Sequence, residues 1–504
     1  MKNFFRVGLI GVALLLLGGC QEDFLEKNPL DSISSQTFWK TEADVNMALT
    51  GVYSRLRGGF FGYRRPWLDC YSDNAYDRFN AYNFQNLTLG IVNNTNVSSA
   101  FYNVPYQGIA SCNYFLDNVD KAPISEARKN IVKGEVRFLR ALFYYDLVTA
   151  FGGVIIYKTI PSSVDAAKIK QSSRQEVLTF IEEDLDFAIT HLPEAKFEGH
   201  AVKGSAMGLK TRVLLGQEKW AEAATLAKEI IDKGTFSLAP SYKGLFLTAT
   251  QIGSPEIMFS TRFLAPNSYH GDFAGLDIEL GWFGAINVYS NLAEEYEMKN
   301  GMLISEPGSG YDPANPGANR DPRLAVTIRV PGEKFINPDG TEFQYSDAPQ
   351  TPYMMKKYID FSRLPFGYTK ANQTDQHCIH LRYADVLLMY AEAKNEVSGP
   401  DATIYAALDQ IRARPDVKMP PVNRQRYNTK EKVRELIRHE RRVELALEGL
   451  RYADLKRWKT IETRFAALKN PANVSLKFGE KNYVLPFPQT ELDRNKELVQ
   501  NAGY

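Results

Sequence analysis

The sequence contains few cysteines for its length: Cys20, Cys70, Cys112 and Cys378 in 504 residues. So few thiols exclude a disulfide framework of the kind that holds small secreted domains together. If Cys20 is lipidated, the other three form an odd set that allows at most one bridge. A hydrophobic core must therefore stabilise the fold, and a long chain that is 44% hydrophobic can build a large one.

An excess of charge of either sign is also missing, because 60 basic side chains face 59 acidic ones. A global electric field that would attract nucleic acid or an anionic surface is therefore absent. The balance favours a partner that is neutral or is recognised locally. We predict no nucleic acid among the partners.

Motifs for common enzyme chemistry are missing as well. The chain has no Gly-x-Ser-x-Gly nucleophile elbow and no Walker sequence, so nucleophilic and nucleotide chemistry lack support. A tight cluster of His377, Cys378 and His380 lacks the spaced ligand pairs of a zinc site. We predict no metal, no cofactor and no catalytic residue.

Long apolar runs are confined to the N-terminus. Lys2 and Arg6 precede an apolar stretch at residues 7–17, which is too short to span a bilayer and has the length of a signal-peptide core. Small residues then lead to a cysteine in the order Leu-Gly-Gly-Cys, as in a bacterial lipobox. We predict a lipoprotein signal peptide at 1–19 and lipidation of Cys20, which would anchor the protein to a membrane without spanning it.

Amphipathic helices dominate what is present. Residues 126–150 and 173–191 carry apolar side chains three and four positions apart, which predicts one buried stripe on each helix. Residues 204–234 and 382–414 each indicate two short antiparallel helices with alternating small and large side chains, and they resemble tetratricopeptide repeats. The fold class predicted is mainly α, with a tetratricopeptide-like helical scaffold mainly at 40–57, 106–234 and 380–460.

Two segments lack this helical period. Residues 58–105 and 235–375 are rich in Gly, Pro, Asn, Asp and aromatic side chains. Irregular chain of such length inside a compact protein is usually functional or forms a lobe of its own. We predict that these two segments form a second lobe of loops and short strands, which lies against the helices and faces the ligand.

Several motifs make the chain similar to one known family. Four stand in order: GEVRFLRALFYYDLVTAFGGV at 134–154, HLRYADVLLMYAEA at 380–393, IRHERRVELALEGLRYADLKRW at 437–458 and YVLPFPQTELDRNKELVQNAGY at 483–504. They resemble the successive signatures of the SusD/RagB family. The stretch FLEKNPLDSISSQTFWKTEADVNMALTGVY resembles its N-terminal region. The resemblance implies one SusD-like domain over residues 20–504, with a tetratricopeptide-based scaffold and a loop-rich second part.

The resemblance also implies a function. Family members cap a SusC-like TonB-dependent transporter and capture nutrients, usually glycans but in some relatives peptides or glycoproteins. Gln21, Glu22 and Asp23 resemble the export signal that sends lipoproteins of Bacteroidetes-like bacteria to the outer face of the outer membrane. We therefore expect a non-enzymatic, surface-exposed, lipid-anchored receptor that delivers an oligosaccharide or polysaccharide to its transporter. Alternatives are a secreted glycoside hydrolase with a carboxylate pair in the irregular segments, or a scaffold for other surface proteins.

One group of carboxylates could be mistaken for a catalytic pair. Glu440, Glu444 and Glu448 stand four residues apart and would share one helical face. Four arginines stand among or near them in the sequence: Arg438, Arg441, Arg442 and Arg451. Positive neighbours oppose the raised pKa that a general acid needs, whereas guanidinium–carboxylate pairs commonly fix helix packing. We predict a structural network here.

A sugar site needs aromatic platforms for the apolar faces of the rings and polar groups for the hydroxyls. Trp39, Trp220 and Trp458 lie in family or repeat motifs, which indicates packing roles. Trp67 and Trp282 remain. The predicted ligand-binding residues are these two and their polar or aromatic neighbours: Trp67, Asp73, Tyr76, Arg78, Tyr82, Trp282 and Phe283, with Asp77 in the same stretch. A structural role is the alternative for each of them.

Overall fold

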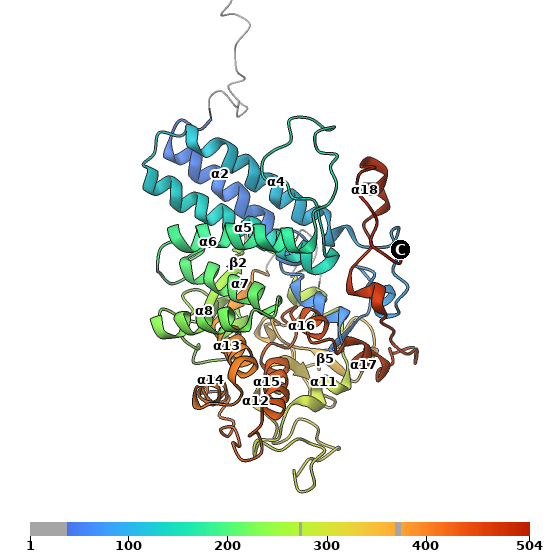
Figure 1. The fold of residues 1–504 in the computed structure, drawn as a ribbon. Helices are drawn as coiled ribbons and strands as arrows, with labels where there is room; N and C mark the ends of the chain where they lie inside the picture. Colours follow the sequence, from blue (N-terminus) through green and yellow to red (C-terminus); the bar gives the residue numbers. More distant parts are fainter. Residues whose placement is uncertain (1–37, 272–274, 368–373) are drawn as a thin grey trace, which may run out of the picture.

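A computed structural model describes residues 38–271, 275–367 and 374–504 (Figure 1). Its longer helices are α2 (Glu42–Ser54), α4 (Asn103–Asn118), α5 (Glu126–Phe151), α6 (Arg174–His191), α7 (Lys203–Leu215), α8 (Trp220–Lys233), α13 (Tyr383–Ser398), α14 (Ala402–Arg412) and α15 (Lys430–Glu444). Shorter helices are α3 (Phe84–Thr88), α9 (Thr248–Gln251), α10 (Leu276–Glu279), α11 (Ser290–Glu295), α12 (Pro322–Thr327), α16 (Arg451–Arg457), α17 (Ile461–Ala466) and α18 (Gln489–Arg494). The strands are β1 (Ala75–Asp77), β2 (Ile257–Thr261), β3 (Ile286–Val288), β4 (Ile328–Arg329), β5 (Tyr353–Met355) and β6 (Cys378–Arg382). The prediction of a mainly α fold is confirmed.

The long helices stack in sequence order into one layer. Helix α5 packs on α6, α6 on α7 and α7 on α8, and α13 then packs directly on α8 although a long segment separates the two in the sequence. Figure 1 shows this series running from α2 at the top to α14 at the lower end. The pairs α7/α8 and α13/α14 are the two helical hairpins that the repeat pattern predicted.

Small residues set the close spacing of these helices. Ala223 and Ala227 of α8 are fully buried. A Cβ atom at Gly208 of α7 would stand 2.3 Å from the Leu381 side chain of β6, so only glycine allows that approach. Helix α8 ends at Gly234, whose φ of 65° is left-handed, a conformation that glycine adopts without strain.

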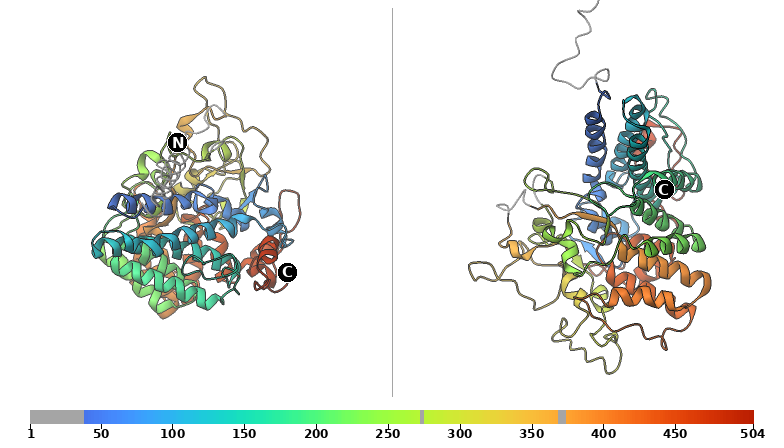
Figure 2. Two further views of the ribbon diagram at one scale, coloured as in Figure 1. Left: turned by 90° about the horizontal axis from the view of Figure 1, so that it is seen from above. Right: turned by 90° about the vertical axis from the view of Figure 1, so that its left-hand side faces the viewer.

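The segment between α8 and α13 is closed at its base by a strand pair. Strand β2 pairs antiparallel with β6, which leads directly into α13, so both ends of the segment meet beside the scaffold. Its strands β3, β5 and β4 form an antiparallel sheet in the order β1-β3-β5-β4, and β1 comes from the earlier irregular segment. In the right-hand view of Figure 2 the irregular segments lie on one side of the molecule and the helical layer on the other.

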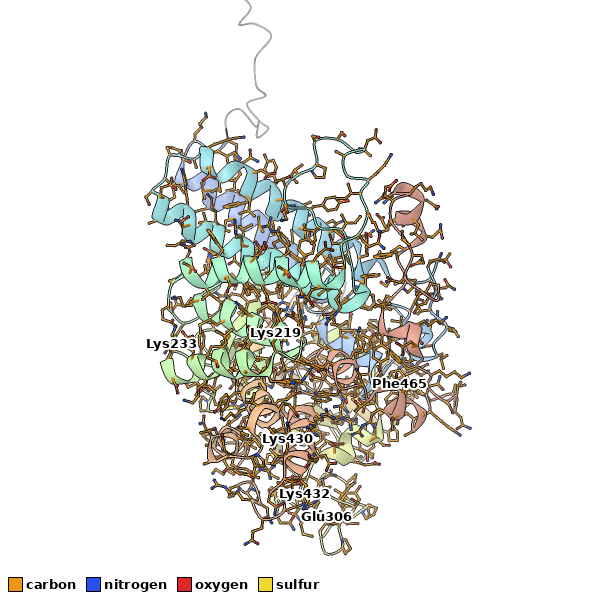
Figure 3. The ribbon with its side chains drawn as sticks, in the orientation of Figure 1. Lys219, Lys233, Glu306, Lys430, Lys432 and Phe465 are labelled. Atoms are coloured by element: carbon orange, nitrogen blue, oxygen red, sulfur yellow. The ribbon has the colours of Figure 1, made fainter. Side chains whose placement is uncertain are left out.

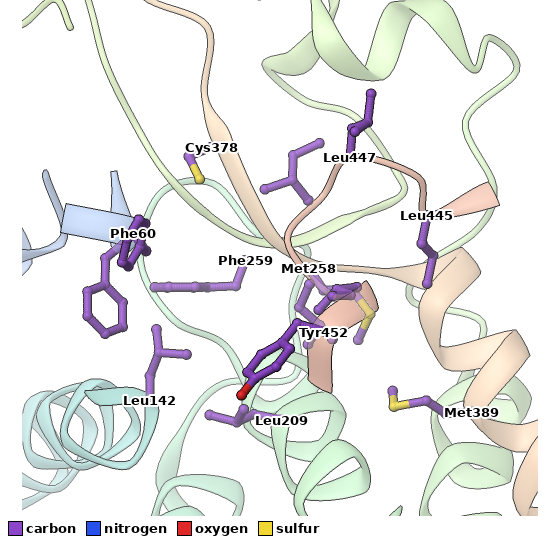
Figure 4. Packing of buried hydrophobic residues seen from close by; sticks show 14 of the residues in the cluster. Phe60, Leu142, Leu209, Met258, Phe259, Cys378, Met389, Leu445, Leu447 and Tyr452 are labelled. Carbon is purple, nitrogen blue, oxygen red and sulfur yellow. The ribbon is translucent and has the colours of Figure 1, made fainter. Parts of the chain in front are cut away.

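A hydrophobic cluster joins the two parts. Figure 4 shows Phe60, Leu142, Phe259 and Tyr452 converging from four separate segments of the chain. Much of the segment at 58–84 is buried in this cluster between the scaffold and the sheet, although Phe79 within it is exposed.

The carboxylates Glu440, Glu444 and Glu448 form a buried ionic network, as predicted, but with different geometry and partners. Helix α15 ends at Glu444, so Glu448 lies beyond it and the three do not share one helical face. Their partners come from distant segments: Arg323 and Arg412 for Glu440, Arg323, Arg382 and Arg414 for Glu444, Arg382 and Lys357 for Glu448. The network therefore ties α15 and the turn that follows it to the irregular segment, to β6 and to the end of α14.

The arginines that are close in sequence bind other carboxylates. Arg441 pairs with Asp385 and Asp454, and Arg442 pairs with Asp73 and Glu295. Sequence proximity was a wrong guide to pairing here, because the chain brings distant charges together in the core.

Other sequence features have structural settings. Cys70, Cys112 and Cys378 are buried and unpaired. His380 lies in the core, where its Nε2 is 2.9 Å from Thr261 Oγ1 and 3.0 Å from the Phe61 carbonyl oxygen. Within the described ranges no cluster of three or more metal-ligating side chains occurs, and no helix is both long and apolar enough to cross a bilayer. Cys20 and the predicted signal peptide lie outside the described residues.

Candidate functional site

Trp67 and Asp73 are core residues. Trp67, in a 3-10 helix at Arg65–Tyr71, exposes 2% of its surface, so the prediction that its ring faces a ligand is contradicted by its burial. The Asp73 carboxylate accepts from Arg451 at 2.7 and 2.9 Å and lies 3.3 Å from Arg442. Burial alone would raise the pKa of Asp73, but the two guanidinium groups hold it well below its usual value. Both residues therefore stabilise the fold, and we exclude them from the candidate site.

Tyr76 and Tyr82 are also largely buried. Tyr76 stands in β1 opposite Asn287 of β3. The Tyr82 hydroxyl accepts a hydrogen bond from Arg64 Nη1 at 2.8 Å, and Arg64 also pairs with Glu279 at 3.0 Å. Tyr82 therefore positions the Arg64 side chain. Arg64 is 41% exposed, so a ligand can reach its guanidinium group but not the buried Tyr82 ring.

Three aromatic rings gather where β1 and β3 end on one side. The rings of Trp282 and Phe283 lie 4.9 Å apart, and Phe79 stands edge-on to Phe283 at 6.2 Å. Phe79 is 51% exposed, whereas Trp282 and Phe283 are half-buried. Because Phe79 follows β1 and Phe283 precedes β3, the pairing of these strands brings the two rings together. Sequence reasoning passed over Phe79, whose only signal was its place beside Arg78.

Charged groups border these rings. The Arg78 guanidinium lies 5.3 Å from the centre of the Phe79 ring, donates to the Phe283 carbonyl oxygen at 3.3 Å and pairs with the exposed Asp347 at 3.3 Å. We call the surface of Arg78, Phe79, Trp282, Phe283 and Asp347 the Phe79 patch. It offers apolar ring surface beside a hydrogen-bond donor and an acceptor, which is the combination that suits a sugar ring.

The loop that carries Phe79 is held by the adjacent strand. Asp77 Oδ1 accepts from the Phe79 backbone N–H at 3.2 Å, and the Arg78 N–H donates to the Ala285 carbonyl oxygen at 3.0 Å. These bonds hold the backbone that carries the Phe79 side chain. A fixed platform loses little conformational freedom on binding.

Comparison with known proteins identifies the family. A family model described as "SusD family" matches residues 260–504, and one described as "Starch-binding associating with outer membrane" matches residues 23–215. This chain belongs to the SusD/RagB family. The resemblance seen in its sequence motifs is thereby confirmed, and the second description associates that family with the outer membrane.

Relatives of this SusD/RagB protein match it along nearly the whole chain. SusD-like protein P2 of Formosa agariphila is 27% identical and covers 98% of both chains. Among solved structures, a SusD-like carbohydrate binding protein from Bacteroides fragilis is 27% identical, with a TM-score of 0.79 over 92% of this chain and all of its own. A laminarin binding SusD-like protein is 25% identical, with a TM-score of 0.73 over 92% of this chain and all of its own.

Carboxyl groups with raised pKa values are buried in this SusD/RagB protein. Burial raises the pKa of Asp69, Asp77 and Asp277 to about 6. Asp69 accepts from the backbone N–H groups of Leu447 and Gly449 and thus fixes the turn after α15. None of the three aspartates faces solvent, so they do not form the accessible acid–base pair that glycoside hydrolysis requires.

Proposed function

We propose that this SusD/RagB protein is a non-enzymatic surface receptor that binds a glycan at the Phe79 patch and delivers it to a SusC-like TonB-dependent transporter. The observation that carries the proposal is the aromatic platform of the exposed Phe79 and the half-buried Trp282 and Phe283 beside Arg78 and Asp347. The carbohydrate-binding and laminarin-binding relatives support it. The burial of Asp69, Asp77 and Asp277 supports the absence of turnover.

A glycan panel tests the proposal. The purified protein is incubated with polysaccharides that include starch and laminarin, and both retention and new reducing ends are measured. Retention without new reducing ends is the expected result, since the patch provides binding groups without an accessible acid–base pair. Release of products would identify a hydrolase instead. Failure to retain any member of a broad panel would contradict glycan capture.

Lipid anchoring through Cys20 makes a separate prediction. Replacing Cys20 with alanine removes the only thiol next to the signal peptide, so the protein should lose acylation and leave the membrane fraction. Fractionation of cells that also lack the transporter isolates this effect from binding to a partner. Membrane association that persists in that background would contradict the predicted anchor.

Partnership with a transporter can be tested in native membranes. A lid that seals a pore requires a large interface, above about 1,000 Å². We expect cross-linking followed by mass spectrometry to recover a TonB-dependent barrel together with this protein. Recovery of the cross-linked protein without such a barrel would contradict the proposed delivery step.

A further inference from the structure

A second polar surface lies apart from the Phe79 patch. It is a groove of about 940 Å³ between α15, α11 with the segment that follows it, and the region of α16 and α17. Six cationic side chains line it: Arg426, Lys432, Arg438, Arg442, Arg451 and Arg464. Three acidic side chains line it as well: Glu294, Glu295 and Glu435. We call this surface the arginine groove. Figure 3 labels two residues that help to locate it: Lys432, which lines the groove, and Phe465 of α17, which follows Arg464 in the sequence.

Some of these cations are neutralised by the protein itself. Arg451 and Arg442 pair with the buried Asp73, and Arg442 also pairs with Glu295 at 2.8 Å. Glu295 is shared with His439, whose ring also lies 3.5 Å from Glu297. Burial would lower the pKa of His439, but the two glutamates raise it to about 10, so this histidine adds a further positive charge.

Two other arginines lie beyond ion-pair distance of every carboxylate that the structure describes. Among the described residues neither Arg438 nor Arg464 makes an ion pair or a hydrogen bond through its guanidinium group, and the half-buried Arg438 has its Nε shielded from solvent. The Arg438 guanidinium lies 4.8 Å from the Trp458 ring, whose Nε1 is fixed by a hydrogen bond to Glu392 at 2.7 Å. Arg438 is thus held in place by stacking while its donors stay unused.

The surroundings of Arg438 carry charges of both signs. Burial lowers the pKa of Arg438, and Arg457, which lies 4.8 Å from the same Trp458 ring, lowers it further, while Glu392 and Glu396 oppose the shift from beyond ion-pair distance. A guanidinium group in such a setting is stabilised by an oxyanion that accepts two of its N–H groups at once. Arg464 on α17 supplies a second exposed donor across the groove.

We propose that the arginine groove binds the carboxylate or sulfate groups of an acidic oligosaccharide, so that acidic glycans are the substrate class. The inference rests on the proposed glycan-binding function. The volume lies near the top of the range of about 300 to 1,000 Å³ found for ligand pockets, which is enough for a short oligosaccharide. Asp73 beneath the groove and Arg78 in the Phe79 patch flank the same strand, β1, so one strand pair supports both surfaces.

The test titrates the full-length protein calorimetrically with three probes: a heparin tetrasaccharide that carries sulfates and carboxylates, neutral maltotetraose, and inorganic sulfate. We expect the heparin tetrasaccharide to bind, with an affinity that falls as salt is added. In the double variant Arg438→Gln/Arg464→Gln this affinity should fall at least tenfold. The control Arg57→Gln/Lys170→Gln removes the same charge from exposed positions away from the groove and should leave it unchanged.

The proposal would be overturned if the heparin tetrasaccharide did not bind, or if it bound the groove variant as tightly as the wild type. It would also be overturned if inorganic sulfate bound as tightly as the tetrasaccharide, because the groove would then be a simple ion site. Melting curves verify that the variants fold. If Arg438→Gln melts early, Arg464→Gln alone repeats the test, because its side chain is exposed. Loss of binding only in Phe79-patch variants would refute the groove and leave the receptor function standing, and the reverse pattern would refute only the patch.

Discussion

Replacement of Glu444 with alanine is expected to lower the free energy of unfolding by about 3 to 5 kcal/mol. The Glu444 carboxylate is fully buried and pairs with Arg382 at 2.7 Å and with Arg323 and Arg414 at 2.9 Å each. Its removal takes one carboxylate away from all three buried guanidinium groups, and the loss of these contacts is costly in the low-dielectric core even though each arginine keeps another carboxylate partner. Denaturant titration of the variant and the wild type measures the difference.

Glu435→Ala is the matched control for this experiment. Glu435 lies on the same helix, α15, but is exposed and makes no ion pair among the described residues, so its loss should change stability by less than about 0.5 kcal/mol. If Glu444→Ala unfolded like the wild type but lost turnover of a glycan, the carboxylate would be catalytic and the structural assignment of the network would fail.

Combined replacement of Phe79 and Trp282 with alanine should weaken glycan binding on the order of 100-fold. Each ring that stacks on a sugar contributes about 1 to 2 kcal/mol, and this corresponds to roughly five- to thirty-fold in affinity per residue. The two rings belong to one patch, on either side of Phe283. Titration with the glycan that the panel selects measures the loss.

Tyr114→Ala controls for the loss of an exposed aromatic ring. Tyr114 is 47% exposed on α4 and lies outside the patch, so its replacement should leave glycan affinity unchanged. Trp282 also packs partly against the core, and the double variant should therefore melt slightly earlier than the wild type. An unchanged affinity in the double variant would show that the glycan binds elsewhere.

The helical scaffold was predictable because its signals are local. The apolar periodicity gave the bounds of α5 and α6 to within one residue and the joint range of the α7/α8 hairpin. The pairing of α13 with α8 was not predictable in this way, since it depends on β2 and β6 closing the long segment between them. Local pattern specifies helices, whereas strand pairing between distant segments specifies how they meet.

The binding residues were only partly predictable because exposure is a tertiary property. Trp67 and Trp282 both stand in irregular sequence, yet the first is enclosed in the shared core and the second reaches the surface beside Phe79. Asp73 looked like a polar group for a ligand, but Arg442 and Arg451 come from a distant segment to neutralise it. Pairs between distant segments leave no spacing pattern in the sequence.

Hydroxyl-radical footprinting with and without the selected glycan tests the Phe79 patch as the binding site, because it reports which side chains the ligand covers. We expect oxidation of Phe79 and Trp282 to fall when the glycan is added, while oxidation of Tyr114 stays the same. Unchanged oxidation of Phe79 and Trp282 at saturating glycan, with protection appearing on another surface, would contradict the Phe79 patch as the binding site.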